Sequence, residues 1–170
     1  MAAILGGITI SMFTIIAMYF MYVRAAASFE ESKLDQLAQV FNEARSDQKK
    51  DQYTRAEQGY QNVIKALKHP KTMPGQALKA DAIANLGHVY IQWQKLDLAY
   101  AILINAVDQG IEDRNVYNNL AFVVQVLHKD LDSAQAWLDK ANDLKSKDGR
   151  LHKKEAAASA AFRKRQGFVI

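Results

Sequence analysis

Residues that could carry out chemistry are few in this chain, and they are scattered. The four histidines (His69, His88, His128 and His152) lie in four different segments, and no pair has the i, i+4 spacing of a helical metal site. The sequence contains no cysteine, which excludes disulfides, thiolate metal sites and cysteine nucleophiles. It also lacks a Gly-rich phosphate loop and a nucleophile–base motif. We therefore predict no catalytic residue, no metal site, no cofactor and no enzymatic activity.

The basic residues are gathered near the C-terminus. The 170 residues carry a formal net charge of +4, but residues 145–165 alone carry eight cations against two anions. Such charges complement a helix end and keep it soluble, or they contact anionic lipid headgroups or an acidic partner. Because no aromatic interleaving or nucleic-acid motif accompanies them, we do not expect the chain to bind nucleic acid.

The segment from Ala2 to Val23 contains no charged residue over 22 positions. A helix of that length is about 33 Å long, which matches the hydrocarbon core of a bilayer. Tyr19, Phe20 and Tyr22 gather near its end, as in an interfacial aromatic belt, and Arg24 follows. We predict a transmembrane anchor over residues 1–24, with membrane attachment through residues 2–23.

A cleaved signal peptide is the alternative interpretation of this segment, because three alanines at 25–27 supply small residues for cleavage. No cation precedes the apolar run, however, and the run is longer than the usual signal-peptide core. The retained anchor is therefore favoured. Within it, Ala3, Gly7 and Ser11 recur every fourth residue, a pattern that lets another membrane helix pack closely.

The remainder of the chain is predicted to be helical throughout. Apolar residues three to four positions apart predict one helix over residues 28–47, with Leu34, Leu37 and Phe41, and a second helix over 53–68. Polar residues from Arg45 to Gln52 indicate a turn between them. Two prolines and a glycine between residues 69 and 75 predict a break before the next helix.

From residue 80 onward the helical pattern repeats. Ile83, Leu86, Gly87 and Tyr90 recur 34 residues later as Tyr117, Leu120, Ala121 and Val124. Ala99, Leu103 and Ala106 recur 35 residues later as Ala134, Leu138 and Ala141. The one-residue difference is expected to be an inserted residue in the turn at 128–132. The small residues let paired helices approach closely, whereas Tyr90, Leu103, Leu120 and Leu138 are expected to fill the space between them.

This pattern resembles the tetratricopeptide repeat (TPR), in which a helix with Leu-Gly and Tyr pairs with a helix bearing small residues. The resemblance covers about residues 30–145. Ala56, Tyr60 and Val63 are similar to the second helix of an earlier unit, and Leu37-Ala38 with Phe41 to its first helix. The resemblance implies an α-solenoid of about three helical hairpins with a capping helix at about 149–165, and a protein-binding role.

In TPR proteins the side chains of the first helices line a partner-binding groove. The resemblance therefore implies that the groove is lined by Asp81, Asn85, His88, Gln92, Asn115, Asn119, Phe122 and Val126. Asn85 and Asn119 are one repeat apart and are expected to hold a ligand backbone, or else are ordinary polar surface residues. Asp81 and Asn115 stand where chaperone-binding clamps carry cations, so a chaperone clamp is not expected.

The predicted protein is all-α, with an anchor at 1–24, a linking helix at 25–52, repeats at 53–148 and a basic capping helix and tail at 149–170. We expect an adaptor that binds other proteins during assembly or stabilisation of a membrane complex. The alternative is a permanent accessory subunit of such a complex, with its anchor packed among other membrane helices. Cations after the anchor, beginning with Arg24 and Lys33, favour a single-pass protein of a bacterial or organellar inner membrane with a cytoplasmic repeat domain, and a periplasmic domain is the alternative.

Overall fold

Everything that the structure describes is helical. The computed structural model describes residues 2–145, except for the side chains of residues 2–11 and 13. The helices are α1 (Ala2–Lys49), α2 (Tyr53–Ala66), α3 (Met73–Gln92), α4 (Leu96–Asp108), α5 (Arg114–Val123) and the π-helix η1 (Val124–His128), followed by helical residues 131–145. No strand occurs in this part of the chain, so the predicted all-α fold class is confirmed. The predicted capping helix and tail at 149–170 lie outside the described residues.

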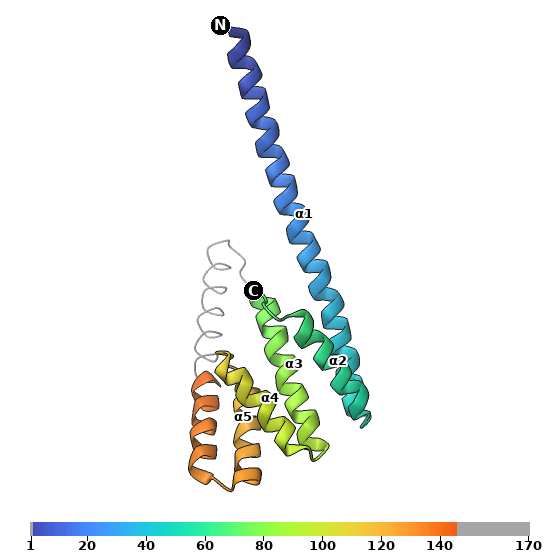
Figure 1. Ribbon diagram of the computed structural model, residues 1–170, viewed down its shortest axis with the longest axis vertical. Helices are drawn as coiled ribbons and strands as arrows, with labels where there is room; N and C mark the ends of the chain where they lie inside the picture. The colour runs from blue at the N-terminus through green and yellow to red at the C-terminus, as the bar shows by residue number, and fades with distance from the viewer. Residues whose placement is uncertain (1, 146–170) are drawn as a thin grey trace, which may run out of the picture.

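The helices form three antiparallel hairpins that stack side by side (Figure 1). The C-terminal half of α1 pairs with α2, α3 pairs with α4, and α5 with η1 pairs with residues 131–145. The first helices α1, α3 and α5 contact one another in sequence, and α2 and α4 contact the first helix of the next hairpin. One hydrophobic core therefore runs through the stack, from Ala44 on α1 to Ala134 in the last helix.

Helix α1 is longer than the domain that it enters. It runs without a break over 48 residues, and its side chains are exposed from residue 14 to residue 33. Leu34 is the first residue of α1 that packs against the core. The N-terminal half of the helix consequently projects from the body of the protein (Figure 1).

The structure and the predicted anchor differ in one respect. Among the described residues, no helix is long and apolar enough to cross a membrane. The side chains of Ala3, Gly7 and Ser11, which were predicted to pack against another membrane helix, lie outside the described part of α1.

Three helices end in the same hydrogen-bonded turn. At the end of α1, the amides of Asp51 and Gln52 donate to the carbonyl oxygens of Gln48 and Asp47 at 3.1 and 2.9 Å. The same pair of bonds ends α3, where Gln94 occupies the left-handed position with φ 59°, and ends α4, where Gly110 does so with φ 76°. These are Schellman motifs, which satisfy carbonyls that the helix itself cannot. Lys129, with φ 56°, occupies the left-handed position in the third hairpin.

The turns correct the predicted register of the first hairpin. Asp51 and Gln94 are 43 residues apart, and so are Ala56, Tyr60 and Val63 from Ala99, Leu103 and Ala106. By the same offset, Ala44 rather than Leu37 or Ala38 is the counterpart of Gly87. The predicted turn at Arg45–Gln52 is correspondingly too early, because α1 continues to Lys49 with Ala44 and Gln48 buried against its neighbours.

The first repeat exceeds the second by nine residues, 43 against 34, and these extra residues extend α3. Helix α3 has 20 residues, whereas α5 has 10. It begins at Met73, earlier than predicted, because the Thr72 side chain accepts a hydrogen bond from the Gly75 amide and Pro74 stands in the first turn, where a helix tolerates proline. The extension carries α3 toward the projecting half of α1 (Figure 1).

The extra residue of the last hairpin lies within a helix rather than in the predicted turn. Val124 is 34 residues after Tyr90, but Lys129 is 35 residues after Gln94. The additional residue therefore falls between Val124 and Lys129, where the chain forms η1. A π-helical turn accommodates one more residue than an α-turn, so the hairpin closes with the same left-handed residue.

Small residues mark the closest helix contacts, as predicted. A Cβ atom at Gly87 would lie 2.7 Å from Leu103 Cδ2, and Leu103 is fully buried. The closest approach was not predicted: a Cβ at Gly59 would lie 2.6 Å from Ala44 Cβ. The prediction that Leu138 fills an interhelical space is wrong, because Leu138 is 39% exposed and the neighbouring Trp137 stacks on Tyr117 instead.

Candidate functional site

The side chains predicted to line a groove come from α3, α5 and η1, but they do not act as one set. Asp81, His88, Gln92, Asn115, Phe122 and Val126 are exposed, and Asn85 and Asn119 are half-buried. Their contacts separate them into four groups: a cavity at one end of the domain, two amides bonded to the α3 backbone, a polar cluster with α1, and an apolar exposed pair.

The cavity, of about 1040 Å³, is open to solvent and brings Asp81 and Asn115 together. Its walls are the start of α3, the α4–α5 loop, the start of α5 and residues 144–145. The extension of α3 supplies one wall with Met73, Gln76 and Ala77. The sequence pattern could not reveal this cavity, because the two repeats that form it differ in length at this point.

The electrostatics of the cavity centre on Asp81. Burial raises the pKa of its carboxyl, and the nearby Asp113 carboxylate raises it further, whereas the Arg45 guanidinium lowers it. Asp113 is the N-cap of α5, with Oδ1 accepting from the amides of Asn115 and Val116 at 2.8 and 2.9 Å. Arg45, Asp81 and Asp113 thus place α1, α3 and α5 around one region, where two carboxylates favour a cationic group of a partner.

The two asparagines have partners within the fold. Asn85 Nδ2 donates to the carbonyl oxygen of Asp81, one turn earlier on the same helix, at 2.8 Å. Asn119 Nδ2 donates to the carbonyl oxygen of Ala84 at 2.9 Å and so ties α5 to α3. The asparagine side chains are therefore part of the helix packing, and their predicted role in holding a ligand backbone stays a prediction.

His88 and Gln92 belong to a polar cluster between the first two hairpins. Gln48 of α1, which is 7% exposed, lies at its centre. Gln48 Nε2 donates to Gln92 Oε1 at 2.9 Å and lies 3.1 Å from His88 Nδ1, while the Tyr60 hydroxyl donates to Gln48 Oε1 at 2.9 Å. Since both hydrogens of an amide nitrogen can be used, this geometry fits a His88 Nδ1 that accepts. The sequence analysis missed Gln48 and Tyr60, because contacts between distant segments leave no local pattern.

A second polar contact joins α2 to α3. The Tyr90 hydroxyl donates to Glu57 Oε1 at 2.7 Å and accepts from Gln61 Nε2 at 3.3 Å. Burial raises the pKa of Tyr90 to about 12, and the hydrogen bond to Glu57 contributes. These residues fix the hairpins relative to each other rather than binding a ligand.

Phe122 and Val126 are apolar and about half exposed, at 47% and 46%. They project from the first-helix side of the last hairpin. Among the described residues, no group of three or more His, Asp or Glu side chains could hold a metal ion. The arrangement is therefore suited to protein contact, through apolar and amide groups around a carboxylate-bearing cavity.

Comparison with known proteins does not add an identity to this geometry. No protein-family model matches the chain, and no curated protein matches it.

Proposed function

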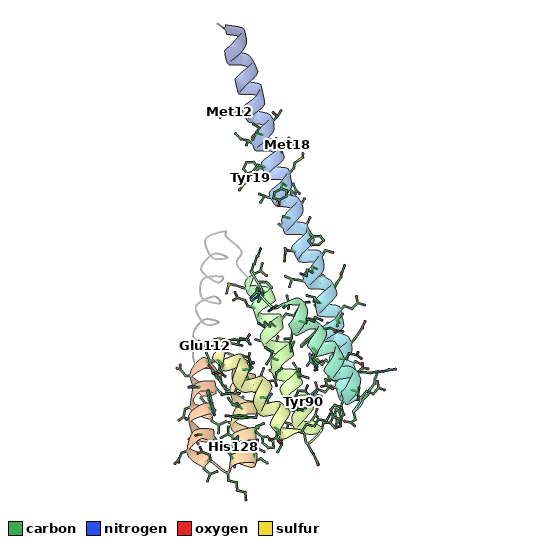
Figure 2. The ribbon with its side chains drawn as sticks, in the orientation of Figure 1. Met12, Met18, Tyr19, Tyr90, Glu112 and His128 are labelled. Carbon is green, nitrogen blue, oxygen red and sulfur yellow. The ribbon has the colours of Figure 1, made fainter. Side chains whose placement is uncertain are left out.

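We propose that this protein is a membrane-attached, TPR-like adaptor that binds other proteins and promotes the assembly or stabilisation of a membrane complex. The observation that carries the proposal is the exposed apolar segment of α1, which is continuous with the stacked hairpins. Nine large apolar side chains of this segment are 44–74% exposed: Met12, Ile15, Ile16, Met18, Tyr19, Phe20, Met21, Tyr22 and Val23. Figure 2 shows Met12, Met18 and Tyr19 on the part of α1 that stands clear of the domain.

A bilayer is the cover that fits this segment best. Soluble monomers rarely expose so large a contiguous apolar surface. The apolar side chains surround the helix rather than forming one stripe, which favours immersion in lipid over packing against a single partner helix. The uncharged run continues to Ala2, which gives the length that a bilayer requires.

The adaptor role is supported by the repeated hairpins. Ala44, Gly87 and Ala121 occupy equivalent positions in the three first helices, and each is buried. The hairpins present first-helix side chains on a common surface, as TPR domains do when they bind partners. A surface of exposed amides with Phe122 at its edge suits a peptide segment of another protein.

Membrane attachment is tested by charge insertion into α1. Ile16→Arg with Phe20→Arg places two cations one turn apart on exposed positions that touch no other helix. We expect this double variant to leave the membrane fraction, since each arginine costs about 2.5–3.5 kcal/mol in a bilayer core. The matched control is Ser28→Arg with Ser32→Arg, which has the same spacing on the exposed part of α1 below the apolar run. Equal membrane retention of both variants would contradict the attachment.

The binding surface is tested by two substitutions of equal exposure. Phe122 and Leu98 are 47% and 46% exposed, but Phe122 lies on a first helix and Leu98 on the second helix α4. Affinity purification in mild detergent should recover fewer partners with Phe122→Ser than with Leu98→Ser. A greater loss with Leu98→Ser would assign binding to the second-helix face. Partners recovered at a fixed ratio to this chain would favour the accessory-subunit role over an assembly factor.

A further inference from the structure

The α2–α3 loop lies at the end of the domain from which the apolar half of α1 emerges. A Cβ at Gly75, in the first turn of α3, would lie 3.5 Å from Leu34 Cδ2. At the other end, Gln48 of α1 bonds to Gln92 of α3. Helices α1 and α3 therefore run parallel, and residues 67–72 lie beside the projecting half of α1, whereas the turns at 50–52 and 93–95 lie at the far end (Figure 1).

This loop and the helix segments beside it carry positive charge alone. Residues 58–80 contain four lysines and neither aspartate nor glutamate. Lys65, Lys68 and Lys71 are exposed. Lys79 is half-buried and donates to the Lys68 carbonyl oxygen and to Gln109 Oε1, both at 3.2 Å, so it holds the loop against α4. The other three ammonium groups lie on the surface of the loop region.

An apolar side chain stands next to these lysines. Met73 begins α3 directly after the loop and is 82% exposed, the highest value among the large apolar residues of the described part. Thr72 caps the helix and Pro74 stiffens its first turn, so the exposed methionine is held on a rigid tip. Lysines flanking an exposed apolar residue are typical of a contact with anionic membrane surfaces.

The remainder of this end of the domain is acidic. Asp108, Glu112 and Asp113 lie at and around the α4–α5 loop, and Figure 2 places Glu112 at the same end, opposite to His128. An anionic surface would attract the side of the domain next to α1 and repel the side that carries the α4–α5 loop. The charges therefore favour one orientation.

The distance between the apolar segment and the loop allows such a contact. Ten exposed residues, 24–33, separate Val23 from Leu34. They span about 15 Å of helix, which compares with a headgroup region of about 5–8 Å and a Debye length of about 8 Å. A moderate tilt of α1 brings the loop into the headgroup region.

We propose that the α2–α3 loop is a second membrane contact, in which Lys65, Lys68 and Lys71 bind anionic lipid headgroups and Met73 enters the interface. The inference rests on the proposed insertion of the α1 apolar segment, which places the loop near the bilayer. The two contacts together fix the tilt of the domain and thereby the direction in which its first-helix surface faces.

The test uses the full chain in vesicles of neutral lipid or of neutral lipid with 30% anionic lipid. Because the chain has no cysteine, Met73→Cys and, at the far end, Gln94→Cys each provide a unique site for an environment-sensitive dye. We expect the dye at 73 to report an apolar environment in anionic vesicles and an aqueous one in neutral vesicles, and the dye at 94 to remain aqueous in both. Lys68→Gln with Lys71→Gln should weaken the loop contact about fivefold per lysine. The control pair, Lys49→Gln with Lys50→Gln at the far end, should not.

Flotation of the same samples separates this inference from the proposed function. A protein that floats with both vesicle types, but whose dye at 73 gives the same signal in both, is anchored without the loop contact, and the inference is overturned. A protein that floats with neither type overturns the membrane attachment as well. A dye at 94 that responds to anionic lipid would also overturn the inference, because the domain would then face the membrane with its other end.

Discussion

At the scale of single residues, the domain depends on side chains that leave no room for an extra carbon atom. Gly59 and Ala44 form the closest such contact, between α1 and α2. Ala44 Cβ is fixed to its backbone and cannot rotate away, in contrast to the end of a long side chain. Close packing of this kind makes even one methyl group costly.

Gly59→Ala is therefore expected to lower the free energy of unfolding by about 1–3 kcal/mol. This outcome opposes helix propensity, which favours alanine over glycine by about 1 kcal/mol. Adding Ala44→Gly should restore much of the loss, because it removes the atom that the new methyl meets. Urea unfolding of the three variants checks both steps, and a stability gain in Gly59→Ala alone would contradict the observed packing.

Gly87→Leu tests the second close contact, which the repeat pattern had predicted. The new side chain would have to displace Leu103, whose Cγ lies 2.9 Å from the position of a Cβ at Gly87. We expect a loss of at least about 1–3 kcal/mol in stability. A melting temperature equal to that of the parent would show that α3 and α4 can separate without cost.

Two buried tyrosines make the stability sensitive to alkaline pH. Burial raises the pKa of Tyr60 to about 12, against a smaller opposing effect of Arg45, and burial with Glu57 raises that of Tyr90 to about 12. In the unfolded chain both titrate near pH 10. The folded state therefore binds more protons between pH 10 and 12, so its stability is fully present below pH 10 and falls as the pH rises toward 12. Tyr60→Phe should flatten this fall, measured as the slope of unfolding free energy against pH; an unchanged slope would mean that Tyr60 does not contribute.

At the scale of helices and turns, each hairpin closes on a residue in the left-handed conformation that is not glycine. Asp51, Gln94 and Lys129 have φ values of 58°, 59° and 56°. This conformation costs an L-residue about 1–2 kcal/mol, whereas glycine adopts it freely. The chain accepts that cost because the turns must close in register for the core to form.

Gln94→Gly is accordingly expected to stabilise the protein, by about 1 kcal/mol after allowance for the greater freedom of glycine in the unfolded chain. The melting temperature measures the gain. Gln125→Gly is the matched control, because Gln125 is also exposed but has helical geometry, and this substitution should destabilise. A loss of stability in Gln94→Gly would contradict the Schellman turn at the end of α3.

At the scale of the whole molecule, a single helix joins the apolar segment to the hairpins. Because α1 is unbroken from residue 2 to residue 49, any tilt of its apolar half is transmitted to the domain. The proposed lysine contact of the α2–α3 loop would limit this tilt. The protein would then hold its first-helix surface at a set height and direction relative to the membrane.

The side of the membrane on which the domain lies follows from the cations. Arg24 and Lys33 come directly after the apolar run, whereas no Lys or Arg precedes it in the sequence given. The positive-inside rule then predicts a cytoplasmic domain. A C-terminal green-fluorescent-protein fusion should be fluorescent and an alkaline phosphatase fusion inactive. The reverse pair of results would assign the domain to the periplasmic side.

The sequence by itself determined that the protein is all-helical and where most helices lie. Apolar residues three to four positions apart report which face of a helix is buried, and this signal is strong between residues 80 and 142. The recurrence of Gly87 as Ala121 predicted a close helix contact, since small residues at repeated positions have few other purposes. The sequence also showed the uncharged run at 2–23 and the concentration of charge near the C-terminus.

Only the tertiary structure decided which helices meet, and at what register. Periodicity describes one helix at a time, so Leu37-Ala38 with Phe41 appeared to be as good a first-helix pattern as the segment around Ala44. The contact of Ala44 with Gly59 resolves this choice. The same holds for the Gln48 cluster and for the cavity at Asp81, which join residues tens of positions apart. Such sites arise from the stacking of hairpins of unequal length, and the energy that fixes them comes from contacts that no local stretch of sequence contains.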